Sequence, residues 1–213
     1  MINGIQLKIC GITNVADAKA ADLIGTDFLG FNLYPKSPRY IPLATFVQME
    51  PQLPQCKRVA VMVRPSVKEL SDVSKAGFDF FQLHFDPETD HGLVESWSGV
   101  IGSERLWLAP RLVTCQPFPE WLMPIADTFL IDTYRKELFG GSGATGDWDR
   151  FHKLRSENPK KLWILAGGLK PENITQALVQ SEAQAIDVNS GVELCPGIKD
   201  PEKLEALSKV FNG

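Results

Sequence analysis

Apolar runs of strand length alternate with longer segments of helical character along this chain, and the alternation occurs eight times. Several runs are continuously apolar, as from Val59 to Val63, which is typical of parallel strands that are buried on both faces. The predicted strands are 5–10, 27–33, 57–63, 79–83, 105–112, 127–132, 161–166 and 184–189.

Start and stop residues delimit the helices between these strands. Asn14 precedes one helical segment and Gly25 follows it, as expected of an N-cap and a terminating glycine. Ser66 and Glu69 have the spacing of a capping box. Proline opens two later segments. The predicted helices are 15–24, 67–76, 172–180 and 202–211, together with the glycine- or proline-rich segments 91–102 and 117–124.

Eight such units of about 25 residues predict a closed (β/α)8 TIM barrel of class α/β, formed as one domain by residues 1–213. A chain of this length is long enough for one sizeable core and short for two ordinary domains. An open doubly wound sheet is the alternative. It lacks the support of a GxGxxG motif after the first strand.

Composition narrows the range of partners. The net charge is −4 and no basic block stands out, so we expect neither a nucleic-acid partner nor an anionic membrane surface. No apolar run reaches the roughly 20 residues of a membrane span, and the N-terminus does not resemble a signal peptide. The four cysteines are widely spaced, which fits a reducing cytoplasm better than a disulfide scaffold or zinc ribbon.

The active site of a barrel of this kind lies at the carboxyl ends of its strands. The first predicted strand ends at Cys10. Cysteine is commonly a small buried apolar residue, and that interpretation stays open here. Strand periodicity places Lys8 on the same face, and a neighbouring ammonium would lower the thiol pKa and favour a reactive thiolate.

Three further strand ends carry polar residues. Asp132 ends the sixth strand, either as a loop-ordering residue or as a catalytic acid. Arg39 follows the second strand, either as a solvated charge or as a clamp for a carboxylate or phosphate. Gln82 and His84 end the fourth strand. His84 and His91 lack compact ligand spacing, so the sequence predicts no metal site.

Glycine-rich stretches follow the sixth, seventh and eighth strands. Such loops let backbone N–H groups approach an anion, and this part of the barrel is the usual phosphate site. The pattern predicts phosphate binding by Gly141, Ser142, Gly143, Gly167, Gly168, Ser190 and Gly191.

Motifs distributed over the chain carry a resemblance to a known family. They are KICGIT at 8–13, SPRYI at 37–41, QLH at 82–84, the aspartate and GGSG stretch at 132–143, LAGGLKPENI at 165–174 and DVNSGVE at 187–193. In this set and order they resemble the phosphoribosylanthranilate isomerases.

The resemblance implies an Amadori rearrangement of N-(5-phosphoribosyl)anthranilate in tryptophan biosynthesis, without metal or cofactor. It implies that Cys10 is the general base, with a lowered pKa, and that Asp132 is the general acid, with a raised pKa. Arg39 would contact the anthranilate end, with Gln82 and His84 also binding substrate. The expected partner is this small phosphorylated aminosugar, bound by a cytoplasmic monomer or homodimer.

Two positions depart from the family pattern, namely Phe85 after QLH and Asn32 in the second strand. We expect Phe85 to crowd the loop after the fourth strand and Asn32 to place a polar group near the substrate. Other phosphate-binding barrel isomerases and a non-catalytic phosphosugar-binding barrel are alternatives, and intact Cys10 and Asp132 weigh against both. Activity on the related histidine-pathway aminoaldose stays open.

Overall fold

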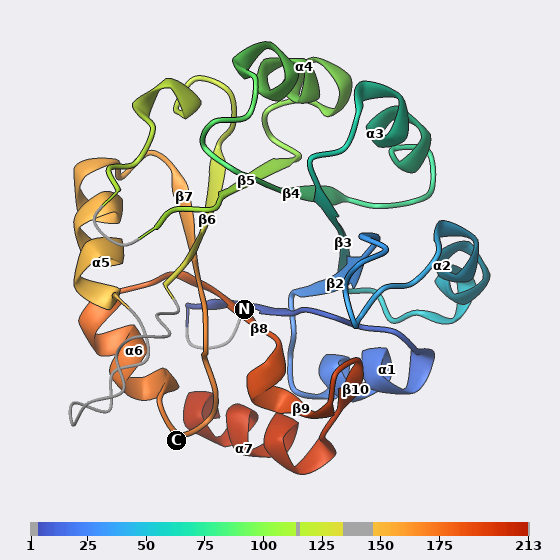
Figure 1. Ribbon diagram of the computed structural model, residues 1–213. Coiled ribbons are helices and arrows are strands. Elements are labelled where there is room, and N and C mark those ends of the chain that lie inside the picture. The colour runs from blue at the N-terminus through green and yellow to red at the C-terminus, as the bar shows by residue number, and fades with distance from the viewer. Residues whose placement is uncertain (1–3, 114–115, 134–146, 213) are drawn as a thin grey trace.

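The computed structural model describes residues 4–113, 116–133 and 147–212. Eight parallel strands close into a barrel, in which β1 pairs with both β2 and β8 (Figure 1). The strands are β1 Gln6–Ile9, β2 Phe28–Asn32, β3 Lys57–Val63, β4 Phe80–Phe85, β5 Leu106–Pro110, β6 Thr128–Asp132, β7 Leu162–Ala166 and β8 Ala185–Val188. The predicted (β/α)8 barrel is confirmed, and the open-sheet alternative is wrong.

Helices surround the barrel and cover its outer face (Figure 1). Within the described residues they are α1 Val15–Leu23, α2 Leu43–Met49, α3 Val67–Val73, α4 His91–Ile101, α5 Trp148–Glu157, α6 Ile174–Ser181 and α7 Pro201–Asn212. The side chain of Asn14 caps α1, and Ser66 and Glu69 form the predicted capping box of α3.

The segment 117–124 does not form the predicted α-helix. It contains only a single 3-10 turn, η2 Glu120–Leu122. Pro117, Pro119 and Pro124 supply no backbone N–H and restrict the residues before them, which explains why a regular helix does not propagate here. Helix α6 also begins later than predicted, because Pro171 and Glu172 lie in a turn that precedes it.

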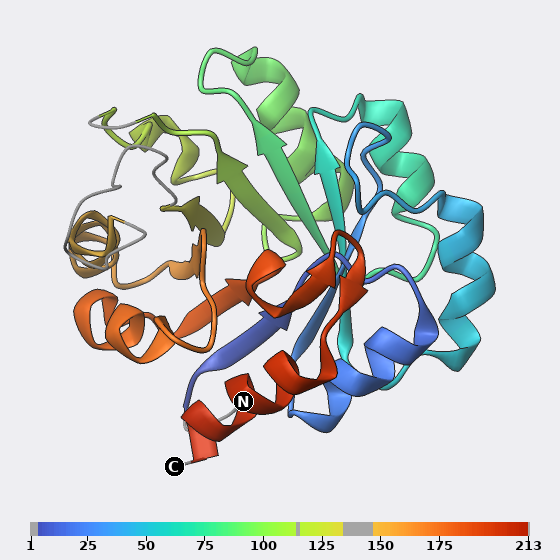
Figure 2. The same ribbon diagram turned by 60° about the horizontal axis from the view of Figure 1, so that its bottom comes forward.

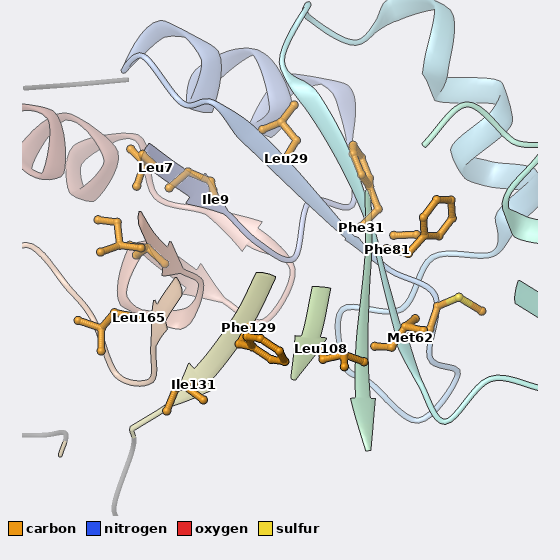
Figure 3. Close-up of a cluster of buried hydrophobic side chains, with 14 of the residues drawn as sticks. Leu7, Ile9, Leu29, Phe31, Met62, Phe81, Leu108, Phe129, Ile131 and Leu165 are labelled. Carbon is orange, nitrogen blue, oxygen red and sulfur yellow. The ribbon is translucent and has the colours of Figure 1, made fainter. Parts of the chain in front are cut away.

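Successive residues of each strand face alternately outward and inward. The outward residues belong to one large core shared with the helices, as the side chains of Leu7, Ile9, Leu29 and Phe31 illustrate (Figure 3). The inward residues form a second, smaller apolar cluster. In that cluster Phe28 packs edge-to-face on Trp107, with ring centroids 5.0 Å apart.

The interior becomes polar toward the carboxyl ends of the strands, where Lys8, Gln82 and Asp187 are buried. A short antiparallel hairpin of β9 Glu193–Cys195 and β10 Ile198–Lys199 follows β8 and was not predicted from the sequence (Figure 2). In the part of the chain that the structure describes, no helix has the length and apolarity that a membrane span needs.

Candidate active site

A pocket of about 210 Å³ opens at the carboxyl end of the barrel. Its walls come from inward-facing strand residues and from the loops after β7 and β8. The lining residues are Cys10, Asn32, Val61, Gln82, His84, Leu130, Asp132, Ala166, Gly167, Gly168, Leu169, Asp187, Asn189 and Ser190. The barrel therefore brings together seven of the predicted site residues, namely Cys10, Gln82, His84, Asp132, Gly167, Gly168 and Ser190.

Cys10 directly follows β1, and its side chain is 4% exposed, with that exposure in the pocket. The turn after it requires Gly11, which has a φ of +74°. A Cβ at this position would lie 2.6 Å from Asn189 Oδ1 and 2.7 Å from Arg39 Cδ. The missing side chain lets the loops after β2 and β8 close over the end of β1.

The Lys8 ammonium donates a hydrogen bond of 2.8 Å to Asp187 Oδ1 inside the barrel. Burial raises the pKa of the Cys10 thiol; the charge of Lys8 opposes this effect and the charge of Asp187 adds to it. The expected neighbour of Cys10 is therefore confirmed, but the prediction that its pKa is lowered is wrong. The reason is that burial of the thiol outweighs the charge of Lys8, which the neighbouring carboxylate of Asp187 also counteracts.

Asp132 is the last residue of β6, and its side chain is exposed at the pocket. The following residue, Thr133, donates from both its backbone N–H and its Oγ1 to Ala166 O, each at 2.9 Å, which ties the end of β6 to β7. Cys10 and Asp132 therefore reach one pocket from strands that lie well apart around the ring (Figure 1).

Gln82 and His84 lie on β4, two positions apart, and both face the pocket. Gln82 Nε2 and His84 Nε2 are 2.8 Å apart. Burial, and secondarily the charge of Lys8, lowers the pKa of His84 to about 4, so the imidazole is neutral at physiological pH. Gln82 Oε1 is buried and has no hydrogen-bond partner among the described residues, which leaves an acceptor free at the pocket.

Arg39 lies against Gly11 and is held by Glu193. Its Nε donates to Glu193 Oε1 at 2.8 Å, and the terminal nitrogen Nη2 donates to Oε2 at 2.6 Å. Lys199, which is fully buried, donates to the same carboxylate at 3.1 Å. Burial alone would raise the pKa of Glu193, but its bonds to Arg39 and Lys199 outweigh that effect and lower it.

Two of the loops predicted to bind phosphate, those after β7 and β8, meet at one side of the pocket. Gly167 and Gly168 have φ values of +100° and +63° and line it, together with Ser190. Asn173 fixes this loop by donating to Gly168 O and accepting from the Lys170 N–H. Gly191 lies so close to the backbone of Leu169 that no side chain fits. The candidates Gly141, Ser142 and Gly143 lie outside the described residues.

The two departures from the family pattern have different surroundings. Asn32 lines the pocket, as expected, and its Oδ1 accepts from the Tyr34 N–H at 3.0 Å. Phe85 is 2% exposed and packs edge-to-face on Trp97 of α4, with centroids 5.6 Å apart. It belongs to the outer core, so the expectation that it crowds the loop after β4 is wrong. The inward positions of β4 are Phe80, Gln82 and His84, of which the last two line the pocket.

His84 and His91, considered from the sequence as possible metal ligands, lie in different surroundings. His84 faces the pocket, whereas His91 opens α4 and stacks on Trp121, with ring centroids 3.6 Å apart.

Four polar residues of the site were not singled out from the sequence, namely Asp187, Asn189, Glu193 and Lys199. A usable signal existed for the first two, because every second residue of β8 faces inward. No local pattern identifies Glu193 and Lys199, because their role depends on the β9–β10 hairpin that folds beside Arg39.

The fold and the pocket define a (β/α)8-barrel protein with a thiol, a carboxylate and glycine loops at the end where such barrels carry their active sites. The family model of N-(5'-phosphoribosyl)anthranilate (PRA) isomerase matches residues 7–210. The chain therefore belongs to the PRA isomerase family, and the resemblance predicted from the motifs is confirmed.

Relatives of known name agree with this assignment. The N-(5'-phosphoribosyl)anthranilate isomerase of Syntrophus aciditrophicus is 35% identical over 95% of this chain and 85% of its own length. A phosphoribosyl anthranilate isomerase solved in complex with reduced 1-(o-carboxyphenylamino)-1-deoxyribulose 5-phosphate is 30% identical, with a TM-score of 0.78 over 98% of this chain and 99% of that one. Monomers generated from the dimeric enzyme of Thermotoga maritima give 30% identity and a TM-score of 0.77 over the same shares.

Proposed function

We propose that this chain isomerises N-(5'-phosphoribosyl)anthranilate to the 1-(2-carboxyphenylamino)-1-deoxyribulose 5-phosphate product, as an enzyme of tryptophan biosynthesis. Family membership supports this assignment. The observation that carries the chemistry is that Cys10 and Asp132, from opposite parts of the strand ring, line one pocket with the glycine loops.

The reaction needs an acid and a base on different sides of the sugar. Asp132, in its protonated form, delivers a proton to the furanose ring oxygen, and the ring opens to an iminium. The positive charge acidifies the hydrogen at C2′. Cys10, as a thiolate, removes that proton, and the resulting enol tautomerises to the amino ketone. Positioned acid–base groups of this kind contribute about 10²–10⁴-fold in rate.

The raised pKa of Cys10 fits this sequence of events. A buried thiol next to a neutralised ammonium remains protonated in the resting site. Formation of the iminium places a positive charge near the thiol, and an opposite charge favours the ionised form. The base would then be generated at the step that uses it.

The remaining residues in and around the pocket would hold the two ends of the substrate. The loops at Gly167, Gly168 and Ser190 offer backbone N–H groups to the phosphate, and Gly191 brings the two loops together. Arg39, oriented by Glu193, would face the anthranilate carboxylate. Gln82 and His84 would contact the sugar, where the free Gln82 Oε1 can accept from a hydroxyl.

We further propose that the substrate is the only small-molecule partner the reaction needs, and that the chain works in the cytoplasm. The dimeric state named for the Thermotoga maritima relative makes a homodimer one possible assembly and a monomer the other. Sedimentation of the purified chain distinguishes the two.

Turnover of freshly generated substrate tests the assignment. The parent is expected to consume it, whereas Cys10→Ser and Asp132→Asn each lose about 10²–10⁴-fold in turnover number and remain folded. The double variant is expected to lose little more than either single one, because both groups serve one reaction. Cys56→Ser, which removes a thiol bonded to Asp22 outside the pocket, is the matched control.

Near-parental turnover in a folded Cys10→Ser or Asp132→Asn protein would contradict these roles. A parent that binds the reduced product analogue and shows no turnover would instead support a non-catalytic phosphosugar-binding barrel.

A further inference from the structure

The Lys8–Asp187 ion pair is buried inside the barrel, next to Cys10. The two side chains are 1% and 9% exposed, and their charged atoms are 2.8 Å apart. They stand opposite each other in the β1–β8 register, in which Lys8 pairs with Asp187. Removing two charges from water costs free energy, so we looked for a function of the pair at this position.

Gly30, on the neighbouring strand β2, fixes where these groups meet. A Cβ at Gly30 would lie 2.9 Å from Cys10 Sγ and 2.9 Å from Lys8 Nζ. The thiol and the ammonium therefore share the space that the missing side chain leaves open. Cys10 and Lys8 also face inward from the same strand, two positions apart.

The charges around the thiol come from four elements. Lys8 of β1 and Asp187 of β8 have the largest effects on the thiol, and Lys199 of β10 and Arg39 of the loop after β2 also interact with it. Arg39 and Lys199 are both bonded to Glu193, whereas the ammonium of Lys8 is shared between Asp187 and the thiol. Lys8 is therefore the cation placed to respond to a change at Asp187.

We propose that Asp187 and Lys8 are positioning residues for Cys10: Asp187 holds the Lys8 ammonium against the thiol, in the space left open at Gly30. The inference rests on the proposed role of Cys10 as the base. Asp187 competes with the thiolate for one cation and so restrains its ionisation. Without that carboxylate, the thiolate becomes the counterion of Lys8.

The pH midpoint of thiolate formation, followed by ultraviolet absorbance, tests this pair directly. The background is Cys56→Ser, Cys115→Ser and Cys195→Ser, so that Cys10 is the thiol observed. Asp187→Asn is expected to move the midpoint below that of the background protein. Adding Lys8→Met to Asp187→Asn is expected to raise it again by about one pH unit or more, since the cation is then gone.

Turnover supplies the second measurement. At a fixed pH below the thiol midpoint, each unit of upward shift costs about tenfold in thiolate and hence in turnover number. The loss in the double variant should therefore diminish as the pH rises, whereas a merely structural defect would persist at every pH. Lys57→Met with Asp79→Asn is the matched control. In this pair of the same residue types the charged atoms are 3.0 Å apart, the side chains are 61% and 28% exposed, and the pair lies at the opposite end of the strands.

Equal midpoints in Asp187→Asn and in the double variant would overturn the proposal, as would an Asp187→Asn midpoint that is not below the background. If Asp187→Asn does not fold, the double variant is compared with the background, and a midpoint that is not raised overturns it. The absorbance needs no turnover. Shifted midpoints in a protein without isomerase activity would therefore support the pair and refute the proposed function.

Discussion

Two buried clusters of charged residues at the carboxyl end of the barrel differ in their net charge. Lys8 and Asp187 form a pair of one ammonium and one carboxylate, which sums to zero. Arg39, Glu193 and Lys199 combine two cations with one carboxylate, which leaves one positive charge. A neutral pair can position a neighbouring group without attracting an anion. The net positive charge of the second cluster, in contrast, can attract a substrate carboxylate.

The surroundings of the clusters agree with that difference. His84 beside the neutral pair stays uncharged, whereas Arg39 of the positive cluster lies next to Gly11. Glu193 occupies the Nε side of Arg39 and one of its terminal nitrogens. The guanidinium still has donors for a second carboxylate.

The largest expected effect comes from removing the carboxylate of the positive cluster. Glu193→Ala leaves Arg39 and buried Lys199 without their shared anion, and breaking a buried pair in this way costs about 3–5 kcal/mol in free energy of unfolding. Chemical denaturation with a two-state analysis measures it. If the variant is as stable as the parent, Glu193 does not hold the cluster together.

Arg39→Ala removes the charge that the cluster is proposed to present to the substrate. Losing one charge-assisted hydrogen bond costs about 1.5–3 kcal/mol, or roughly ten- to a hundredfold in kcat/KM. Steady-state kinetics on the anthranilate substrate, against an analogue without the carboxylate, measures the difference. Equal losses on both substrates would remove Arg39 from carboxylate recognition.

His84, which is buried beside the neutral pair, is expected to make the free energy of unfolding depend on pH. Its pKa is lowered from 6.5 to about 4, so the unfolded chain takes up the proton first as the pH falls. The stabilisation is therefore complete above pH 6.5 and is lost between pH 6.5 and about 4. The loss amounts to about 3 kcal/mol. Denaturation curves at several pH values give the free energy of unfolding, and its dependence on pH in this window should be weaker in His84→Gln than in the parent. An equal dependence in the two proteins would contradict the lowered pKa of His84.

The smallest effect is expected for an ion pair of the same chemistry in solvent. Lys68 and Asp72 on α3 are 88% and 53% exposed and 3.1 Å apart. Water screens such a pair, and holding two long side chains in place offsets the attraction. Lys68→Ala should leave the melting temperature unchanged within error. A loss of stability as large as that expected for Glu193→Ala would show that burial does not explain why the two ion pairs differ in their contribution to stability.

Much of the architecture could be predicted because its signals are local. Continuous apolar runs identified the strands, and Asn14, Ser66 and Glu69 identified two helix starts that the structure confirms. The helix predicted at 117–124 does not form, because the prolines of this segment oppose a regular helix. Phe85 was misplaced because the predicted fourth strand ended at residue 83, whereas β4 continues to Phe85 and turns its side chain into the outer core.

The sequence by itself determined the order of strands and helices and the identity of the residues at the strand ends, because both follow from neighbours along the chain and from a general rule for barrels. Only the tertiary structure decided which charges meet. Lys8 and Asp187 are 179 positions apart, and Arg39 and Glu193 are 154 apart. The direction of the Cys10 pKa was likewise decided by burial and by the carboxylate that already holds Lys8, because electrostatic energies depend on distances that closing the barrel creates.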